Sequence, residues 1–192
     1  MAATPSQMLA LGTLLPSFSL PDVVTGQTFD SASLKEARAS IVAFICNHCP
    51  FVIHIREQLA EFGRYCQERG VRLVAVSSND VEHYAEDAPE RMAEEAQQVG
   101  YTFPYLYDES QDVAKAFRAA CTPEFYLFDG SGRLVYRGQF DDSRPHNGVP
   151  VTGADLRAAV EAVLAGESPS SEQRPSVGCN IKWKSGNAPE YF

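Results

Sequence analysis

The sequence lacks any apolar run that approaches the roughly 20 residues a helix needs to cross a bilayer. Its N-terminus has neither a positively charged segment nor a sustained apolar stretch, so no signal peptide is predicted. We therefore expect a cytoplasmic protein without a membrane partner. Positive charge is also scarce: 16 Lys and Arg stand against 25 Asp and Glu, a formal net charge of −9. This balance argues against nucleic acid as a partner.

No internal repeat is found at periods of roughly 20 to 50 residues, which excludes solenoids and propellers. The length of 192 residues suits one domain with extra segments. The stretch ESPSSEQRPS, which follows Gly166, has the polar, Ser- and Pro-rich composition of a linker. We therefore predict an N-terminal arm over residues 1–12, a domain over 13–166, and a linker and C-terminal tail over 167–192.

Strands and helices alternate along the predicted domain. Residues 17–30 predict two short strands around the Thr25-Gly26 turn, and Ser33 then has the pattern of a helix cap. Residues 123–140 predict a hairpin around DGSG, and residues 154–166 predict an amphipathic helix. Strands are predicted over residues 40–45, 71–78 and 103–108, and helices over residues 51–69, 88–99 and 111–120. The order indicates an α/β fold with parallel strands and a right-handed crossover.

Cys46 and Cys49 stand between a buried strand and a helix, in the stretch CNHCPFV. The positive end of the helix dipole and the neighbouring His48 both stabilise a thiolate, so we expect the pKa of Cys46 to be lowered. Cys49 follows three residues later, where it can attack a mixed disulfide on Cys46 and release the product. The pair therefore has what thiol–disulfide exchange requires.

Two other interpretations of the cysteine pair stay open. A structural zinc site needs four ligands, and the chain has no second C-x-x-C and no His pair, although Cys121 or His146 could contribute. Buried cysteines without any function are also common, and Cys66 on the apolar face of the helix is interpreted as one. We expect no bound metal.

Polar residues at strand ends extend the candidate site. Asn79 and Asp80 follow a parallel strand at the carboxyl edge of the sheet, where function is usual in such folds. The hairpin returns its second strand to the same edge, so the residues after it should lie near the cysteines. These residues are Asp141, Asp142, Arg144 and His146. The alternative is that they form a solvated loop with a local Asp–Arg pair, and that Asn79 and Asp80 only cap the next segment.

Four stretches, CNHCPFV, CTPEFYLFD, DDSRP and GCNIKWK, occur in this order. With them the chain resembles the thioredoxin superfamily, and within it the redoxin branch of alkyl hydroperoxide reductase and peroxiredoxin-like proteins. It is most similar to the bacterial peroxiredoxin-like thioredoxin proteins, over nearly its whole length. The resemblance implies a thioredoxin-like fold: a mixed central sheet flanked by helices, with an N-terminal β-hairpin and a C-terminal tail.

The resemblance also implies roles for individual residues. Cys46 matches the nucleophilic Cys of thioredoxins and aligns with the peroxidatic Cys of peroxiredoxins, while Cys49 matches the resolving Cys of thioredoxins. His48 matches the His of disulfide-isomerase motifs. Pro123 matches the cis-proline that faces the cysteines, and Thr122 before it offers backbone groups to an extended substrate.

Four positions depart from the patterns of these families. Peroxiredoxins place Thr or Ser three residues before the peroxidatic Cys and Pro four residues before that, and here Ala43 and Ala39 stand there. The buried acid of thioredoxins is replaced by Ser40, and the Trp before the first Cys by Ile45. The hydroxyl that should hold a peroxide is therefore missing from its usual place.

We predict a thiol–disulfide oxidoreductase with no bound cofactor, reduced by an external thioredoxin or glutathione system. The first alternative is a peroxiredoxin-like thiol peroxidase with an antioxidant role, which uses Cys46. The second is a non-catalytic thioredoxin-fold module with zinc-binding or inert cysteines. A third thiol, Cys121 or Cys179, is predicted to join the exchange. The alternative is that Cys121 lies in the core and that Cys179 is only a buried residue of the tail, which Ile181 and Trp183 are expected to anchor.

Overall fold

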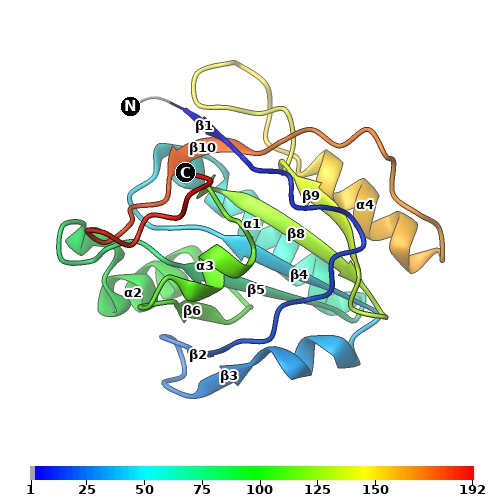
Figure 1. Cartoon of the computed structure of the whole chain (residues 1–192). Helices are drawn as coiled ribbons and strands as arrows, with labels where there is room; N and C mark the ends of the chain where they lie inside the picture. Colours follow the sequence, from blue (N-terminus) through cyan, green and yellow to red (C-terminus); the bar gives the residue numbers. More distant parts are fainter. Residues whose placement is uncertain (1–2) are drawn as a thin grey trace.

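The computed structural model describes residues 3–192. A mixed five-stranded sheet forms its centre, in the order β6-β5-β4-β8-β9 (Figure 1). The first three of these strands are mutually parallel, and the last two form an antiparallel hairpin that joins β4. The strands are β4 (Ala39–Phe44), β5 (Val71–Ser77), β6 (Tyr105–Tyr107), β8 (Glu124–Asp129) and β9 (Leu134–Gly138). This is the thioredoxin-like α/β fold that the sequence predicts.

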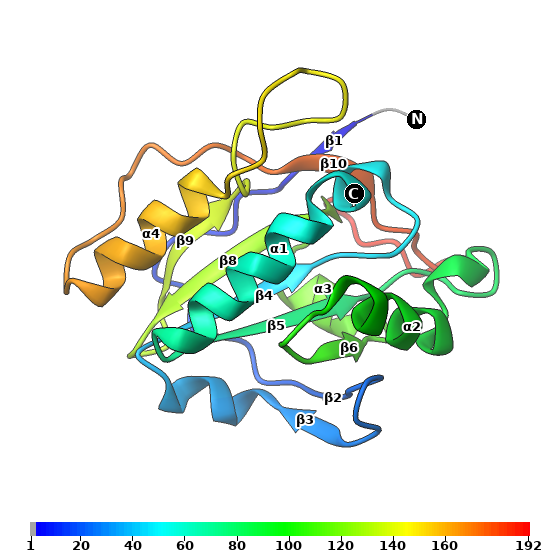
Figure 2. The ribbon, with the colours of Figure 1, turned by 180° about the vertical axis from the view of Figure 1, so that it is seen from behind.

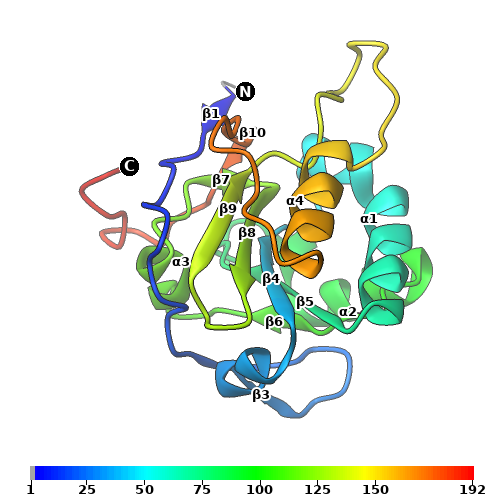
Figure 3. The ribbon, with the colours of Figure 1, turned by 90° about the vertical axis from the view of Figure 1, so that its right-hand side faces the viewer.

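Helices cover both faces of the sheet. Figure 2 shows α1 (Pro50–Glu68), α2 (Pro89–Val99) and α4 (Ala154–Leu164) on one face. The short α3 (Asp112–Ala116) lies on the other, as the side view in Figure 3 makes clear. Every residue of β4 is buried, because it lies in the middle of the sheet with a core on each side. The two cores are separate: Leu59 and Leu156 pack in one, and Phe44 and Phe117 in the other.

The N-terminal segment also behaves largely as the sequence predicts. β2 (Ser19–Pro21) and β3 (Thr28–Asp30) form an antiparallel hairpin beyond the edge strand β6. The short helix after it is a 3-10 helix, η1 (Ser31–Glu36), and its cap is Asp30 and not Ser33. The Asp30 carboxylate accepts the N–H of Ala32 at 2.7 Å, and the helix therefore starts three residues earlier than a Ser33 cap predicts.

The helix predicted over residues 111–120 is shorter than expected. It ends after Ala116, because Arg118 turns the chain with φ at 51°. The backbone N–H of Ala120 then bonds to the carboxylate of Glu124 at 2.9 Å instead of continuing the helix. A second 3-10 helix, η2 (Ala85–Asp87), was not predicted.

The C-terminal tail forms a small second sheet with segments far away in the sequence. Strand β10 (Val177–Asn180) lies between β1 (Thr4–Pro5) and β7 (Cys121–Thr122), antiparallel to both. The predicted anchor is confirmed: Ile181 is 1% exposed within the second core, and Trp183 packs against it. Within residues 3–192, none of the helices is both long enough and apolar enough to cross a bilayer.

Candidate active site

The two cysteines lie where β4 passes into α1. Cys49 is the N-cap residue of α1, with extended backbone angles, and Pro50 occupies the first turn. Cys46 belongs to the loop before it. The helix N-terminus predicted for Cys46 is therefore occupied by Cys49, three residues later.

Thr122 faces both sulfurs from the opposite side. The Cys49 thiol is 3.2 Å from the Thr122 carbonyl oxygen, and the Cys46 sulfur is 3.4 Å from the Thr122 hydroxyl. The Thr122–Pro123 peptide bond is cis, which confirms the prediction. Cys46 is 1% exposed and Cys49 is 0% exposed, so the pair is closed off from solvent in this conformation.

The protonation of the pair differs from the sequence-based expectation. The pKa of Cys49 is lowered to about 2. The largest cause is hydrogen bonding with the Cys179 thiol, and the second is hydrogen bonding with the Cys46 thiol. The pKa of Cys46 is raised, chiefly by its hydrogen bond to Cys49, then by burial and by the negative charge of Asp87. The prediction that Cys46 has the lowered pKa is therefore wrong, because the pKa is raised at Cys46 and lowered at Cys49.

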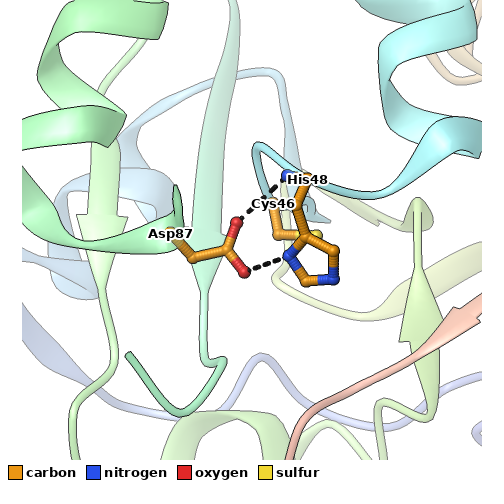
Figure 4. A group of neighbouring side chains, drawn as sticks. All are labelled: Cys46, His48 and Asp87. Atoms are coloured by element: carbon orange, nitrogen blue, oxygen red, sulfur yellow. Dashed lines mark hydrogen bonds and ion pairs between the residues drawn. The ribbon is translucent and has the colours of Figure 1, made fainter. Parts of the chain in front are cut away.

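His48 is held by an acid that sequence reasoning missed. Its Nδ1 lies 2.6 Å from Oδ2 of Asp87, as Figure 4 shows, and Asp87 is fully buried. The other carboxylate oxygen accepts the backbone N–H groups of Asn47 at 2.8 Å and His48 at 3.2 Å. The hydrogen bond to Asp87 raises the pKa of His48, against the opposing effect of burial. Asp87 belongs to no motif, and only the fold brings it to the cysteine loop.

Asn79 connects this acid to the C-terminal tail. Its amide donates to Oδ2 of Asp87 at 2.8 Å, and its carbonyl oxygen accepts the backbone N–H of Lys182 at 2.9 Å. Asn79 thus lies beside the site, as its position after β5 predicts. Asp80 instead binds His83, with 2.6 Å between its Oδ2 and the ring Nδ1.

Comparison with known proteins shows the family to which the chain belongs. The family model described as Redoxin matches residues 10–156. The chain belongs to the redoxin family. It is therefore a thioredoxin-superfamily protein of an oxidoreductase family, as the sequence motifs suggest. No curated protein matches the chain significantly.

Solved structures resemble this redoxin over almost its whole length. An uncharacterized conserved protein from Geobacillus kaustophilus is 50% identical, with a TM-score of 0.94, and the match covers 96% of this chain and 97% of the other. A hypothetical protein from Sinorhizobium meliloti 1021 is 53% identical, with a TM-score of 0.93 and coverages of 95% and 100%. A thiol:disulfide interchange protein from Chlorobium tepidum TLS is 23% identical, with a TM-score of 0.62 and coverages of 81% and 98%, and it supports the fold alone.

The residues after the hairpin lie beside Pro123 but hold their own loop together. Asp141 accepts the backbone N–H groups of Ser143, Thr152 and Gly153. Arg144 donates to the carbonyl oxygens of Asp141 and Ser143, and Asp142 pairs with Arg174. Together with Pro123, Asp141 and Arg144 line a small hollow. Among the hydrogen bonds of residues 3–192, none joins Asp141, Asp142 or Arg144 to Cys46 or Cys49. His146 is exposed.

The two candidate third thiols have different surroundings. Cys179 lies opposite Thr122 across the pairing of β10 with β7, in the same buried core cluster as Cys46 and Cys49. The Cys121 thiol lies 3.9 Å from the carboxylate of Glu124 instead, and burial raises the pKa of Cys121. Burial also raises the pKa of Glu124 to about 7. Cys66 is fully buried in the helix core, as predicted.

Among residues 3–192, one group of potential ligands, Cys46, His48 and Asp87, could hold a metal ion. One ligand atom from each lies within 4.8 Å of the others. The 2.6 Å between His48 Nδ1 and Asp87 Oδ2 is a hydrogen-bond distance. Two ligands of a tetrahedral zinc ion, each about 2.0–2.1 Å from it, lie about 3.3 Å apart. The present arrangement therefore fits a His–carboxylate pair better than a metal site, and the group does not include Cys121 or His146.

Proposed function

We propose that this redoxin is a thiol–disulfide oxidoreductase that uses Cys46 and Cys49 as its redox pair. The observation that carries the proposal is the placement of both sulfurs at the start of α1 against Thr122, the residue before the cis-proline. The Cys49 thiol lies 3.2 Å from the Thr122 carbonyl oxygen, and the Cys46 sulfur lies 3.4 Å from the Thr122 hydroxyl. The lowered pKa of Cys49 adds support, because the thiolate is the form of cysteine that attacks a disulfide. His48, which is bound to Asp87, holds the loop between Cys46 and Cys49 in place.

The proposed reaction has two exchange steps. Cys46 attacks one sulfur of the substrate disulfide, and its proton passes to the first substrate thiolate as that group leaves. The Cys49 thiolate then attacks the Cys46 sulfur and releases the second substrate thiolate. The reaction leaves a Cys46–Cys49 disulfide in the protein. An external dithiol such as a reduced thioredoxin, or glutathione, then reduces this disulfide to the two thiols.

Trapping of the mixed disulfide tests this function. Reduced protein is mixed with oxidised glutathione, and the adducts are identified by mass spectrometry. We expect the Cys49→Ser variant to accumulate glutathione on Cys46, and the Cys46→Ser variant to accumulate none there and to lose turnover. The Cys66→Ser variant is the matched control, because Cys66 is as buried as Cys49 and lies in the helix that Cys49 caps. This variant should behave like the unmodified chain. A Cys46→Ser variant with full turnover would contradict the proposal.

A thiol peroxidase is the second candidate, and two observations favour it. Strand β10 pairs with Thr122, so the backbone groups that an extended substrate would use are occupied, which favours small oxidants. The Thr122 hydroxyl lies 3.4 Å from the Cys46 sulfur and supplies the hydroxyl that is missing at Ala43. Cys46 would attack the peroxide to give a sulfenic acid and an alcohol, and Cys49 would resolve it with loss of water.

Thr122→Val separates the two candidates, because it removes the hydroxyl and keeps the shape. Stopped-flow oxidation by hydrogen peroxide and by oxidised glutathione gives one rate for each oxidant. A fall in the peroxide rate alone supports the peroxidase, whereas equal rates before and after the substitution argue against it.

A zinc-binding or inert module is the alternative without catalysis. Metal analysis of protein purified without chelator tests it directly. One equivalent of zinc that is lost in Cys46→Ser would support the zinc module. Metal-free protein that reduces neither oxidant would leave inert cysteines as the remaining interpretation.

A further inference from the structure

The C-terminal tail approaches the redox pair more closely than most strands could. β10 pairs with β7 so that Cys179 lies opposite Thr122, the residue before the cis-proline. A Cβ atom on the preceding residue, Gly178, would lie 1.9 Å from the Thr122 carbonyl oxygen. Only glycine permits this approach. The side chain of Cys179 is thereby placed at the same Thr122 that the Cys49 thiol contacts.

Cys49 lies beside two other cysteines. Cys46, Cys49 and Cys179 belong to one buried core cluster. All three meet at Thr122, which the Cys46 and Cys49 sulfurs contact and which Cys179 faces across the pairing of β10 with β7. Cys49 is therefore the cysteine that could exchange its disulfide partner between Cys46 and Cys179. Cys179 is 4% exposed, against 1% for Cys46 and 0% for Cys49, and is thus the least buried of the three. Cys121, although next to Thr122 in sequence, has its thiol at Glu124 and takes no part in this contact.

The tail is held in this position by several bonds beyond β10. The backbone N–H of Lys182 donates to Asn79 at 2.9 Å, and its carbonyl oxygen accepts the N–H of Asp80 at 2.8 Å. The Gln111 side chain donates to the same carbonyl oxygen at 2.9 Å, and the N–H of Ile181 donates to Ala120 at 3.0 Å. Because these bonds are buried or partly buried, the contact between Cys179 and Cys49 is a built feature of the fold.

We propose that Cys179 is the third thiol of a relay, in which the Cys46–Cys49 disulfide is converted into a Cys49–Cys179 disulfide. The proposal rests on the function proposed above, which supplies the first disulfide from a substrate disulfide or hydroperoxide. The Cys179 sulfur attacks the Cys49 sulfur, the Cys46–Cys49 bond breaks, and the proton of Cys179 passes to Cys46. One disulfide is replaced by another, so the exchange needs no further oxidant or reductant.

The relay moves the disulfide from the most enclosed part of the cluster towards the surface. An external dithiol can then attack the Cys179 sulfur, the most accessible of the three, and Cys49 departs as the thiolate. Departure is fast from a sulfur whose thiol has a low pKa, and the pKa of Cys49 is lowered by its two thiol neighbours. Cys46 is already a free thiol at that stage and can meet the next substrate.

Tryptic peptides of the oxidised chain distinguish the two disulfides. Cys46 and Cys49 share the peptide 39–56, whereas Cys179 belongs to the peptide 158–182, since the Arg174–Pro175 bond resists trypsin. A Cys46–Cys49 disulfide stays within one peptide, and a Cys49–Cys179 disulfide joins two. The protein is oxidised with oxidised glutathione or with hydrogen peroxide, quenched in acid, alkylated and digested.

We expect the joined peptides in the unmodified chain, with fragmentation placing the bond on Cys49, and we expect none in Cys46→Ser, because the relay starts from the Cys46–Cys49 disulfide. Cys179→Ser should lose the joined peptides and keep the disulfide within peptide 39–56. Cys66→Ser and Cys121→Ser are matched controls and should give the pattern of the unmodified chain. The relay is overturned if only the disulfide within peptide 39–56 forms and Cys179 is fully alkylated, a result that leaves the proposed function standing. If Cys179→Ser forms no Cys46–Cys49 disulfide, the proposed function fails, and the relay fails with it.

Discussion

The two ends of α1 each carry a fully buried cysteine, and the two thiols have opposite properties. Cys49 caps the N-terminus of the helix, and Cys66 lies in its last turn. Both are 0% exposed. The hydrogen bonds from Cys179 and Cys46 lower the pKa of Cys49 to about 2, whereas burial raises the pKa of Cys66 to about 12.

The comparison shows that burial alone does not set the reactivity of a thiol. An apolar environment disfavours the charged form, and at Cys66 the positive charges of Arg157 and Arg69 do not outweigh that effect. At Cys49 the same cost is outweighed by two thiol neighbours, and the positive end of the helix dipole acts in the same direction. One of these neighbours comes from the loop, and the other comes from a tail 130 positions further along the chain, at Cys179. The helix supplies the position, and the rest of the fold supplies the chemistry.

The largest expected effect comes from substituting Cys49, the reactive thiol, and it is compared with the same substitution of Cys66, the inert thiol. Cys49→Ser should lower turnover by about 10³-fold or more, the scale of losing a member of a nucleophilic site. It should also remove the thiolate absorbance that persists below pH ~8.5 in the unmodified chain. Cys66→Ser should change neither. Equal losses in both variants would show that the two ends of the helix do not differ as the structure indicates.

Removal of the tail from Cys49 should make this thiol resemble Cys66. Gly178→Ala places a methyl group against the Thr122 carbonyl, so we expect a loss of about 2–4 kcal/mol in the free energy of unfolding. It should also raise the pKa of Cys49 by separating it from Cys179. Val177→Ala, on the same strand but partly exposed, should cost about 1 kcal/mol or less. Urea denaturation and the pH dependence of alkylation measure both effects, and an unchanged Cys49 would count against the role of the tail.

Substitution of Asp87, the acid beside the cysteine loop, should have an intermediate effect on the pKa of His48 and on stability. Asp87→Asn removes the charge that raises the pKa of His48, and should bring that pKa back towards its ordinary value in an NMR titration. Loss of the buried charged hydrogen bonds should cost about 1–3 kcal/mol. Asp80→Asn is the matched control, because Asp80 bonds to the exposed His83 in the same geometry and should leave His48 unchanged.

The same variant has a predictable effect on the pH dependence of stability. A His whose pKa is raised by folding contributes stability that is complete below its unfolded pKa of about 6.5. That contribution is lost as the pH rises through the higher pKa of the folded state. The unfolding free energy of Asp87→Asn should therefore decline less over this range than that of the unmodified chain. An identical decline in both would exclude the His48–Asp87 pair as its source.

The smallest expected effect is at Cys66 itself. Cys66→Ala removes one buried sulfur from a packed helix face, so we expect a loss of about 1 kcal/mol in stability and no change in redox activity. Thermal or urea denaturation measures the first quantity, and turnover with oxidised glutathione the second. A clear loss of turnover would mean that the far end of α1 also contributes to the reaction.

Local patterns predicted the parts of the site that lie on single elements. The buried run before Cys46, the apolar face after it and the DGSG turn each encode their element through periodicity over a few residues. The cis bond at Pro123 came from the family resemblance, and the structure has it. The Ser33 cap and the end of α3 were wrong, because Asp30 and Glu124 offer competing hydrogen bonds that a periodic pattern does not contain.

The sequence by itself determined the order of strands and helices, the junction that carries Cys46 and Cys49, and the closeness of the chain to the redoxin family. Only the tertiary structure decided which of the two thiols has the lowered pKa. That choice depends on Asp87 and Cys179, which reach the pair through η2 and β10 from far along the chain. The physical reason is that a pKa responds to charges and hydrogen bonds within a few ångströms, whereas a sequence motif records only the neighbours along the backbone.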